Sequence, residues 1–262
     1  MPCNKLKMIC FSPTRTTRRI LDAIAEGIGA EQLEVIDVTR ADRVPETCEC
    51  LDDDLVIIGA PVYGGRIPLT AVERFKVLNS CGTPAVPVVV YGNRAYEDAL
   101  IELSDIAVES GFKPVAGAAF IGEHSFSTDK TPIAVSRPDE DDLNMAREFG
   151  KSLAAKFTEA SFDTSVEVPG DRPYKERSPK VSASPITTDQ CELCGACERV
   201  CPTAAISVGA VVETDPDKCT FCCACIKVCA FEARKLEVPR LLEISQWLTD
   251  NFSERREPEI FI

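Results

Sequence analysis

The feature that most constrains this chain is a doubled run of cysteines in its last third. Nine of the fourteen cysteines lie in the segment from Cys191 to Cys229, and eight of them form the spacing C-x2-C-x2-C-x3-C twice. Pro202 follows the first run and Ala230 follows the second. The first run comprises Cys191, Cys194, Cys197 and Cys201, and the second comprises Cys219, Cys222, Cys225 and Cys229. Sulfur concentrated in one short segment is typical of a metal site rather than of disulfides that cross-link a whole chain.

Two kinds of metal site compete for this pattern. Thiolates at this spacing are the ligands of [4Fe-4S] clusters, whereas zinc sites usually pair two short Cys or His motifs across a longer gap. We therefore predict two [4Fe-4S] clusters, with a zinc site or a disulfide scaffold as the alternative. Cys223 stands next to Cys222, and we interpret it as a small packing residue rather than a spare ligand.

Over about residues 185 to 236 the chain resembles bacterial-type two-[4Fe-4S] ferredoxins. The resemblance implies low-potential one-electron transfer, and it implies crossed ligation, in which the last cysteine of each run binds the other cluster. One cluster would then bind Cys191, Cys194, Cys197 and Cys229, and the other would bind Cys219, Cys222, Cys225 and Cys201. Ala230 replaces the proline usual in this family but removes no ligand.

The first two-thirds of the chain alternates short aliphatic runs with longer segments of helical periodicity. This alternation predicts an α/β fold with a doubly wound, five-stranded parallel sheet. The expected strands are Leu6–Phe11, Leu33–Asp37, Leu55–Ala60, Val86–Tyr91 and Val115–Ile121. The expected helices are Thr17–Gly27, Leu69–Leu78, Glu97–Ser110 and Asp141–Phe157.

The loop after the first expected strand is rich in hydroxyl groups and opens onto a helix. It contains Ser12, Thr14, Arg15, Thr16 and Thr17. Backbone N–H groups and the positive end of a helix favour an anion, and small hydroxyl side chains add hydrogen-bond donors, so we predict a phosphate site. A serine and threonine cluster that only caps the helix is the alternative. The G-x-G-x-x-G fingerprint of dinucleotide sites is absent from this position.

Two glycine-containing loops follow the third and fourth expected strands. Ligands of open parallel sheets bind outside the carboxyl ends of the strands, so these loops should meet the phosphate loop at one edge. Glycines would let the backbone approach a flat ring, and tyrosines would cover its faces. The only histidine, His124, follows the fifth strand, either as a proton donor near the ring or as a locally bonded loop residue. The candidate loop residues are Pro61, Val62, Tyr63, Gly64 and Gly65, and Tyr91, Gly92, Asn93, Arg94 and Tyr96.

Over about residues 5 to 160 the chain resembles a flavodoxin. Ser12, Thr14 and Thr17 meet the T-x-T-x-x-T pattern of the flavodoxin phosphate loop, with Thr16 as an additional hydroxyl and Arg15 in place of a frequent glycine. The resemblance implies strand order 2-1-3-4-5 and bound FMN. The whole chain resembles the fused flavodoxin–ferredoxin proteins of anaerobes, sometimes called flavoferredoxins.

Length and composition predict how the chain is organised. We expect a flavodoxin-like domain over residues 1–160, a proline-containing linker over 161–184, a ferredoxin-like domain over 185–238, and a C-terminal amphipathic helix and tail over 239–262. The formal charge of −13 argues against nucleic acid and suits basic redox partners. No apolar run is long enough for a membrane span, and so many unexported thiols predict a reducing cytoplasm. A homodimer is left open.

We therefore predict an electron carrier that exchanges electrons between FMN and two clusters, with ferredoxin-type donors or acceptors, or an oxidoreductase, as partners. A flavin-dependent reductase of a quinone, a disulfide or an oxygen species is the first alternative, although no nucleophile and base are paired in the sequence. A redox sensor is the second alternative. No catalytic residue is assigned.

Overall fold

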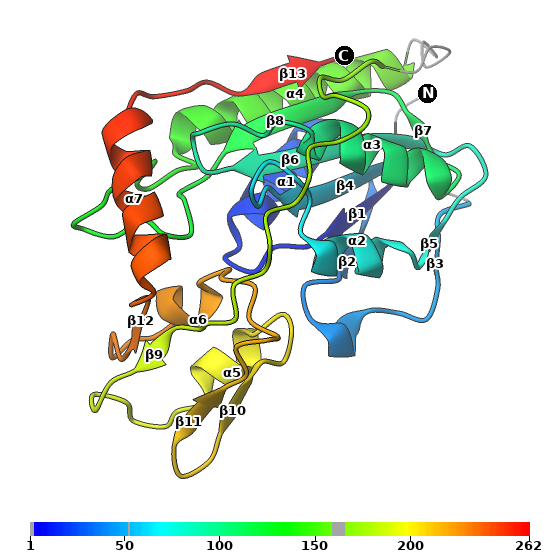
Figure 1. Cartoon of the computed structure of the whole chain (residues 1–262). Coiled ribbons are helices and arrows are strands. Elements are labelled where there is room, and N and C mark those ends of the chain that lie inside the picture. Colours follow the sequence, from blue (N-terminus) through cyan, green and yellow to red (C-terminus); the bar gives the residue numbers. More distant parts are fainter. Residues whose placement is uncertain (1–2, 52, 159–165) are drawn as a thin grey trace.

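The central feature of the computed structural model, which describes residues 3–51, 53–158 and 166–262, is a mostly parallel sheet in the first two-thirds of the chain (Figure 1). The five expected strands are present within two residues of their expected ends. They lie in the order β2-β1-β4-β6-β8, and all four of these pairings are parallel. The strands are β1 (Lys5–Cys10), β2 (Gln32–Asp37), β4 (Leu55–Pro61), β6 (Pro84–Tyr91) and β8 (Gly117–Ile121).

Helices cover both faces of this sheet. Side chains such as Met8 and Ile57 pack with α1 and α4, and the alternate positions Ile9 and Val56 pack with α2 and α3. Strands buried on both faces carry nearly continuous apolar runs, which is why the sequence revealed them. The helices are α1 (Thr16–Ile28), α2 (Leu69–Phe75), α3 (Ala99–Glu109) and α4 (Glu140–Thr158).

This strand order with helices on both faces is the flavodoxin-like arrangement, so the expected fold class is confirmed. Two expected helices are shorter than predicted, α3 by two residues at its start and one at its end, and α2 by three residues at its end. The helix at Leu69 ends at Phe75, because Leu78 belongs to the short strand β5 (Leu78–Asn79), which pairs with β3 (Cys48–Glu49). Two small elements complete this part: β7 (Lys113–Pro114) pairs with β6, and a 3-10 turn spans Ala41–Arg43.

Residues 185–238, which we call the cysteine unit, lie below the sheet in Figure 1 and contain short antiparallel strand pairs. β10 pairs with β11, and β12 pairs with β9. The bounds are β9 (Ile186–Thr187), α5 (Ala196–Val200), β10 (Ile206–Val208), β11 (Val212–Thr214), α6 (Ala224–Lys227) and β12 (Arg234–Lys235).

The C-terminal segment returns to the sheet, which the sequence did not predict. The expected helix is α7 (Pro239–Asn251), and after it β13 (Glu259–Phe261) pairs antiparallel with β8 at the sheet edge (Figure 1). Trp247 of α7 is 50% exposed and packs edge-on against Phe252. No helix among the described residues combines the length and apolarity needed to cross a bilayer.

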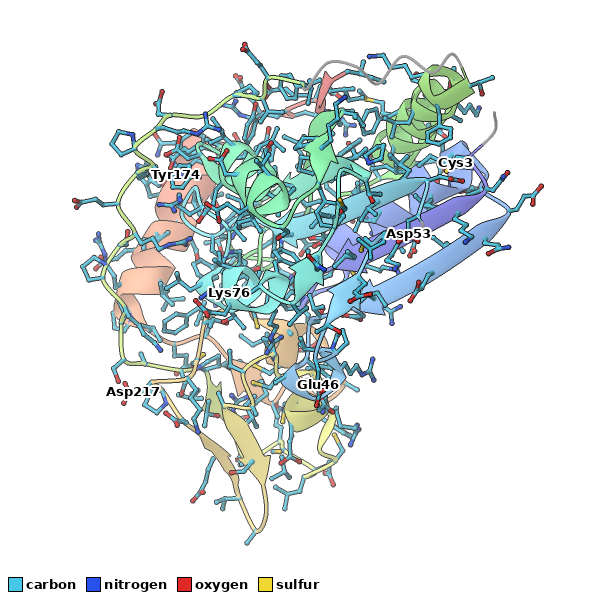
Figure 2. All side chains as sticks on the ribbon, turned by 90° about the vertical axis from the view of Figure 1, so that its right-hand side faces the viewer. Cys3, Glu46, Asp53, Lys76, Tyr174 and Asp217 are labelled. Atoms are coloured by element: carbon cyan, nitrogen blue, oxygen red, sulfur yellow. The ribbon has the colours of Figure 1, made fainter. Side chains whose placement is uncertain are left out.

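Residues 166–184, which we call the strap, wrap along α3 before they reach the cysteine unit. Basic side chains of the strap meet acidic groups of α3: Arg172 pairs with Asp105, and Arg177 pairs with Glu102 at 2.6 Å. In Figure 2 the strap descends past Tyr174 toward Asp217, whose carboxylate accepts a hydrogen bond from Ser182 at 2.6 Å. The first part of the expected linker lies outside the described residues.

Candidate cofactor sites

The cysteine unit is built from two copies of one local structure, 28 residues apart in the sequence. In both copies a non-glycine residue with positive φ occupies the second position after the first cysteine, at Leu193 (φ 50°) and Phe221 (φ 52°). Ala204 (φ 50°) and Glu232 (φ 49°) form an equivalent pair. A left-handed backbone costs free energy at residues other than glycine. Its recurrence at matched positions shows that the two cysteine runs form tight loops of the same conformation.

The residue four positions after the first cysteine of each run also has a left-handed backbone. Gly195 (φ 73°) and Cys223 (φ 59°) are left-handed and stand at the start of α5 and α6 respectively. Glycine adopts this conformation without strain. In the second copy the small residue Cys223 occupies the position that Gly195 holds in the first. Cys223 is 2% exposed and its thiol donates to the Phe221 carbonyl, as expected for a packing residue.

The first group of cysteines surrounds a cavity. Cys191, Cys194 and Cys197 of the first run line it together with Cys229 of the second run and with Arg234. Burial raises the pKa of Cys197, and the positive charge of Arg234 opposes that rise. The last cysteine of the second run therefore lies with the first three of the first run, which is the crossed arrangement.

The second group mirrors the first. Burial raises the pKa of Cys222 to about 12, and the charges of Cys225, Cys201 and Cys219 reinforce the rise. Cys201 of the first run is thus close to the three cysteines of the second run. Within the described parts of the chain, no three Cys, His, Asp or Glu side chains converge on the position of one metal ion.

Matched backbone hydrogen bonds reach the two crossing cysteines. The amide of Ala205 donates to the Cys201 sulfur at 3.2 Å, and the amide of Ala233 donates to the Cys229 sulfur at 3.3 Å. Burial opposes ionisation of Cys229, but backbone N–H groups around its sulfur lower its pKa below the ordinary value. These amides favour the thiolate, which is the form that binds metal.

The hydroxyl-rich loop after β1 opens the N-terminus of α1. Arg15 is left-handed at the N-cap and makes no side-chain hydrogen bond to the helix. Ser12 accepts a hydrogen bond from the Arg18 amide at 3.1 Å, and the hydroxyls of Thr14 and Thr16 are 3.1 Å apart. The hydroxyl of Thr17 is buried without a hydrogen-bond partner. A buried, unpartnered hydroxyl at the start of a helix, among the other hydroxyls of this loop, fits an anion that supplies the missing bond.

The loop after β4 forms a tight hairpin beside the second cysteine group. Tyr63 and Arg66 pair across it, with Gly64 (φ 61°) and Gly65 (φ 84°) at the two central positions. Two consecutive positive φ values are the geometry of a turn that favours glycine. Burial raises the pKa of the Tyr63 hydroxyl, and the nearby charge of Cys222 raises it further. Of the candidate ring-covering tyrosines, Tyr63 is therefore the one that lies against the cysteine unit. Pro61 and Val62, partly buried, lead from β4 into this hairpin.

The loop after β6 is covered by the C-terminal segment. Tyr91 and Tyr96 are both buried and pack edge-on with ring centroids 5.4 Å apart. The Tyr96 hydroxyl donates to Glu259 at 2.8 Å, and the Asn93 side-chain amide donates to the carbonyls of Phe252 and Glu254. These contacts with the C-terminal segment hold the loop in place. Arg94 pairs with Glu97 at 2.7 Å.

His124 is bonded locally on the same edge. Its Nδ1 accepts the amide of Phe126 at 3.1 Å, and its ring lies so close to Gly92 that a Cβ there would meet Cδ2 at 2.2 Å. Burial lowers the pKa of His124 to about 4, and the charges of Arg94 and Lys227 reinforce the effect. His124 is therefore neutral at pH 7, with its Nδ1 engaged in a local hydrogen bond.

Several contacts hold the cysteine unit on this sheet edge. Lys227 of α6 pairs with Glu123 at 2.6 Å. The Arg74 guanidinium donates to the carbonyls of Val38 and Thr39 beyond β2, and also to Pro202, the residue after Cys201. The sequence did not identify Arg74 as a functional residue, because a charged helical residue gives no signal of burial.

The second residue that the sequence missed is Glu102 of α3. Its carboxylate is buried and accepts hydrogen bonds from the Arg66 guanidinium, the Ile67 amide and the Arg177 guanidinium. It thereby holds both the hairpin loop and the strap. Glu102 occupies an otherwise apolar helix face, which is the only sequence signal that could have marked it.

Comparison with known proteins finds one matching family and several solved structures similar to the first part of the chain. Residues 185–207 match the family described as 4Fe-4S binding domain. Among solved structures, an archaeal flavodoxin is 17% identical, covering 59% of this chain and 99% of its own, with a TM-score of 0.41. Flavodoxin 1 from Bacillus cereus is 22% identical, covering 60% and 98%, with a TM-score of 0.39. Rubredoxin oxygen:oxidoreductase from the anaerobe Desulfovibrio gigas is 14% identical, covering 60% of this chain and 37% of its own, with a TM-score of 0.42. No curated protein matches this sequence.

Proposed function

We propose that this protein is an electron carrier of the flavoferredoxin type, which binds FMN and two [4Fe-4S] clusters and couples two-electron to one-electron transfer. The observation that carries the proposal is the crossed grouping of eight cysteines, placed directly against the ligand edge of a flavodoxin-like sheet. A flavodoxin-like fold or a ferredoxin-like unit that acted alone would not need the cysteine groups to contact the edge of the sheet.

For the clusters, the proposed ligand sets follow the two groups. Cys191, Cys194, Cys197 and Cys229 would bind one cluster, which we call cluster 1. Cys219, Cys222, Cys225 and Cys201 would bind the other, which we call cluster 2. The match of residues 185–207 to the 4Fe-4S binding domain family supports iron over zinc.

For FMN, the residues of the sheet edge fit the group. Ser12, Thr14, Thr16 and Thr17 would hold the phosphate at the start of α1, and the unpartnered Thr17 hydroxyl supports this assignment. The hairpin at Gly64 and Gly65 would approach the ring, because neither residue has a side chain to obstruct it. Tyr63 would lie between the ring and cluster 2.

In the proposed arrangement cluster 2 lies between the FMN at the sheet edge and cluster 1. FMN supplies a two-electron couple and each cluster a one-electron couple, so two electrons leaving reduced FMN can fill both clusters while its protons go to solvent. The chain itself fixes the spacing through Arg74 and Lys227, which tie the cysteine unit to the edge. We propose a cytoplasmic location and basic redox proteins as partners, in keeping with a formal charge of −13.

An anaerobic reductive titration of the reconstituted full chain tests this proposal. Uptake of about four electrons per chain, split between flavin absorbance and the electron-spin signals of reduced clusters, is expected. Uptake of about two electrons with only one class of signal would contradict it.

A matched pair of variants tests the phosphate loop separately. Thr17→Val removes the unpartnered hydroxyl at nearly constant volume, and loss of one hydrogen bond to a charged group should weaken FMN binding about tenfold or more. Thr158→Val, at an exposed hydroxyl at the end of α4, is the control and should leave FMN affinity unchanged. Equal affinities in the two variants would exclude this loop as the phosphate site.

A further inference from the structure

A buried cation lies between the two cysteine groups. Arg234 of β12 is 3% exposed, and among the described residues no carboxylate forms an ion pair with it. Its guanidinium donates to the hydroxyls of Thr187 and Thr214, and its Nε is buried with no hydrogen-bond partner. Burying a charge costs several kcal/mol unless an opposite charge compensates. Among the described residues no carboxylate provides that compensation.

The position of Arg234 identifies what could compensate it. Its side chain lines the cavity of Cys191, Cys194, Cys197 and Cys229, and its Nη2 is also 3.9 Å from the sulfur of Cys225 in the second group. One guanidinium therefore faces both groups. The cysteine sulfurs of both groups lie beside it and can carry negative charge.

The internal repeat shows that this cation is not required by the local fold. Arg234 follows Cys229 by five positions, and the equivalent residue after Cys201 is Ile206. Both are buried, and both lie in a short strand that pairs antiparallel with its neighbour. An apolar side chain thus suffices in one copy, whereas the other copy carries an arginine at the boundary of the two groups.

We propose that Arg234 is the shared counter-cation of the two clusters and raises the reduction potential of both. The inference rests on the proposed function. Each reduction adds one negative charge to a cluster, and a fixed cation in a buried, low-dielectric position stabilises the added charge. Arg234 touches no substrate, so it acts by its charge on the clusters.

Three substitutions separate charge from shape. Arg234→Gln keeps hydrogen-bond donors for Thr187 and Thr214 and removes the charge, while Arg234→Lys keeps the charge. Arg234→Ile restores the residue found in the other copy and serves if the glutamine variant folds poorly. Arg240→Gln removes one exposed charge from α7 and is the control.

The readout is the midpoint potential of each cluster, measured by anaerobic titration of the full reconstituted chain with electron-spin detection. Arg234→Gln and Arg234→Ile should reduce the equilibrium constant for cluster reduction at least tenfold, which is about 59 mV for a one-electron couple. Arg234→Lys and Arg240→Gln should stay within about threefold of the unaltered chain.

The outcomes distinguish this inference from the proposed function. An unaltered chain that holds no iron–sulfur clusters removes the proposed function and the inference together. If Arg234→Gln binds both clusters and their midpoint potentials are unchanged, the inference is overturned while the proposed function stands. If Arg234→Gln loses clusters that Arg234→Lys retains, the result supports the role of Arg234 as a counter-charge. If both variants lose their clusters equally, Arg234 acts through its shape and the inference is overturned.

Discussion

Replacing Glu102 by glutamine should destabilise the flavodoxin-like part of the chain by an amount that its contacts define. The carboxylate accepts two bonds from Arg66 at 2.8 Å each, one from the Ile67 amide at 2.9 Å and one from Arg177 at 2.6 Å. Glutamine keeps one acceptor oxygen and loses the negative charge. Two guanidinium groups then lack their counter-charge at the base of the hairpin loop.

The burial of Arg66 and Arg177, the charged partners of Glu102, determines how much the free energy of unfolding falls. Removing one member of a buried ion pair costs about 3–5 kcal/mol, because the remaining charge stays desolvated. The Arg66 side chain is 11% exposed, whereas that of Arg177 is 25% exposed and can turn toward water. One uncompensated buried charge places the expected loss near the lower end of that range, at about 3 kcal/mol in the free energy of unfolding.

Asp105→Asn is the matched control, because it makes the same chemical change one turn further along α3. Asp105 also binds the strap, but its partner Arg172 has a side chain that is 59% exposed, so its loss should cost less than about 1 kcal/mol. Urea unfolding followed by far-ultraviolet circular dichroism measures both. If Glu102→Gln costs no more than Asp105→Asn, the inference that Glu102 anchors the hairpin loop is wrong.

Three further predictions concern the sheet edge and the cysteines. The pKa of His124, about 4 in the folded chain and ordinarily 6.5, means that unfolded chains bind the proton first as pH falls. The unaltered chain should therefore lose more stability between pH 6.5 and 4 than His124→Gln does, and parallel pH profiles in urea unfolding would refute this. Crossed ligation predicts that Cys201→Ser with Cys219→Ser removes one cluster, while Cys201→Ser with Cys191→Ser removes both; iron analysis giving the reverse pattern would indicate uncrossed sets. Arg74→Met should lower the free energy of unfolding by about 2 kcal/mol, since charged hydrogen bonds across the contact with the cysteine unit are lost; an unchanged urea midpoint would count against that role.

The sheet and the cysteine groups could be predicted because their determinants are local or periodic. Strands buried on both faces appear as continuous apolar runs, and ligand spacing is written directly into the sequence. The return of residues 259–261 to the sheet has no such signal. Three residues that include Glu259 show no alternation, and their pairing is decided by the open edge of β8 and by contacts at Asn93 and Tyr96.

The buried charges were missed for a different reason. Glu102, Arg74 and Arg234 belong to residue types that are mostly exposed, and their burial depends on partners from distant segments. Arg234 left a clearer trace in the sequence than Glu102, since alignment of the two cysteine runs sets it against Ile206. Comparing the copies position by position would have singled it out. The placement of the Tyr96 side chain also depends on Glu259 of the C-terminal segment, and the residues around Tyr96 carry no signal of that contact.

The central claim is that one chain carries both kinds of redox group. Chemical analysis of the full chain, purified and reconstituted without air, tests it most directly by counting iron, acid-labile sulfide, zinc and FMN. We predict about eight irons, about eight sulfides and about one FMN per chain. Zinc in place of iron, or no bound flavin after addition of FMN, would contradict the account.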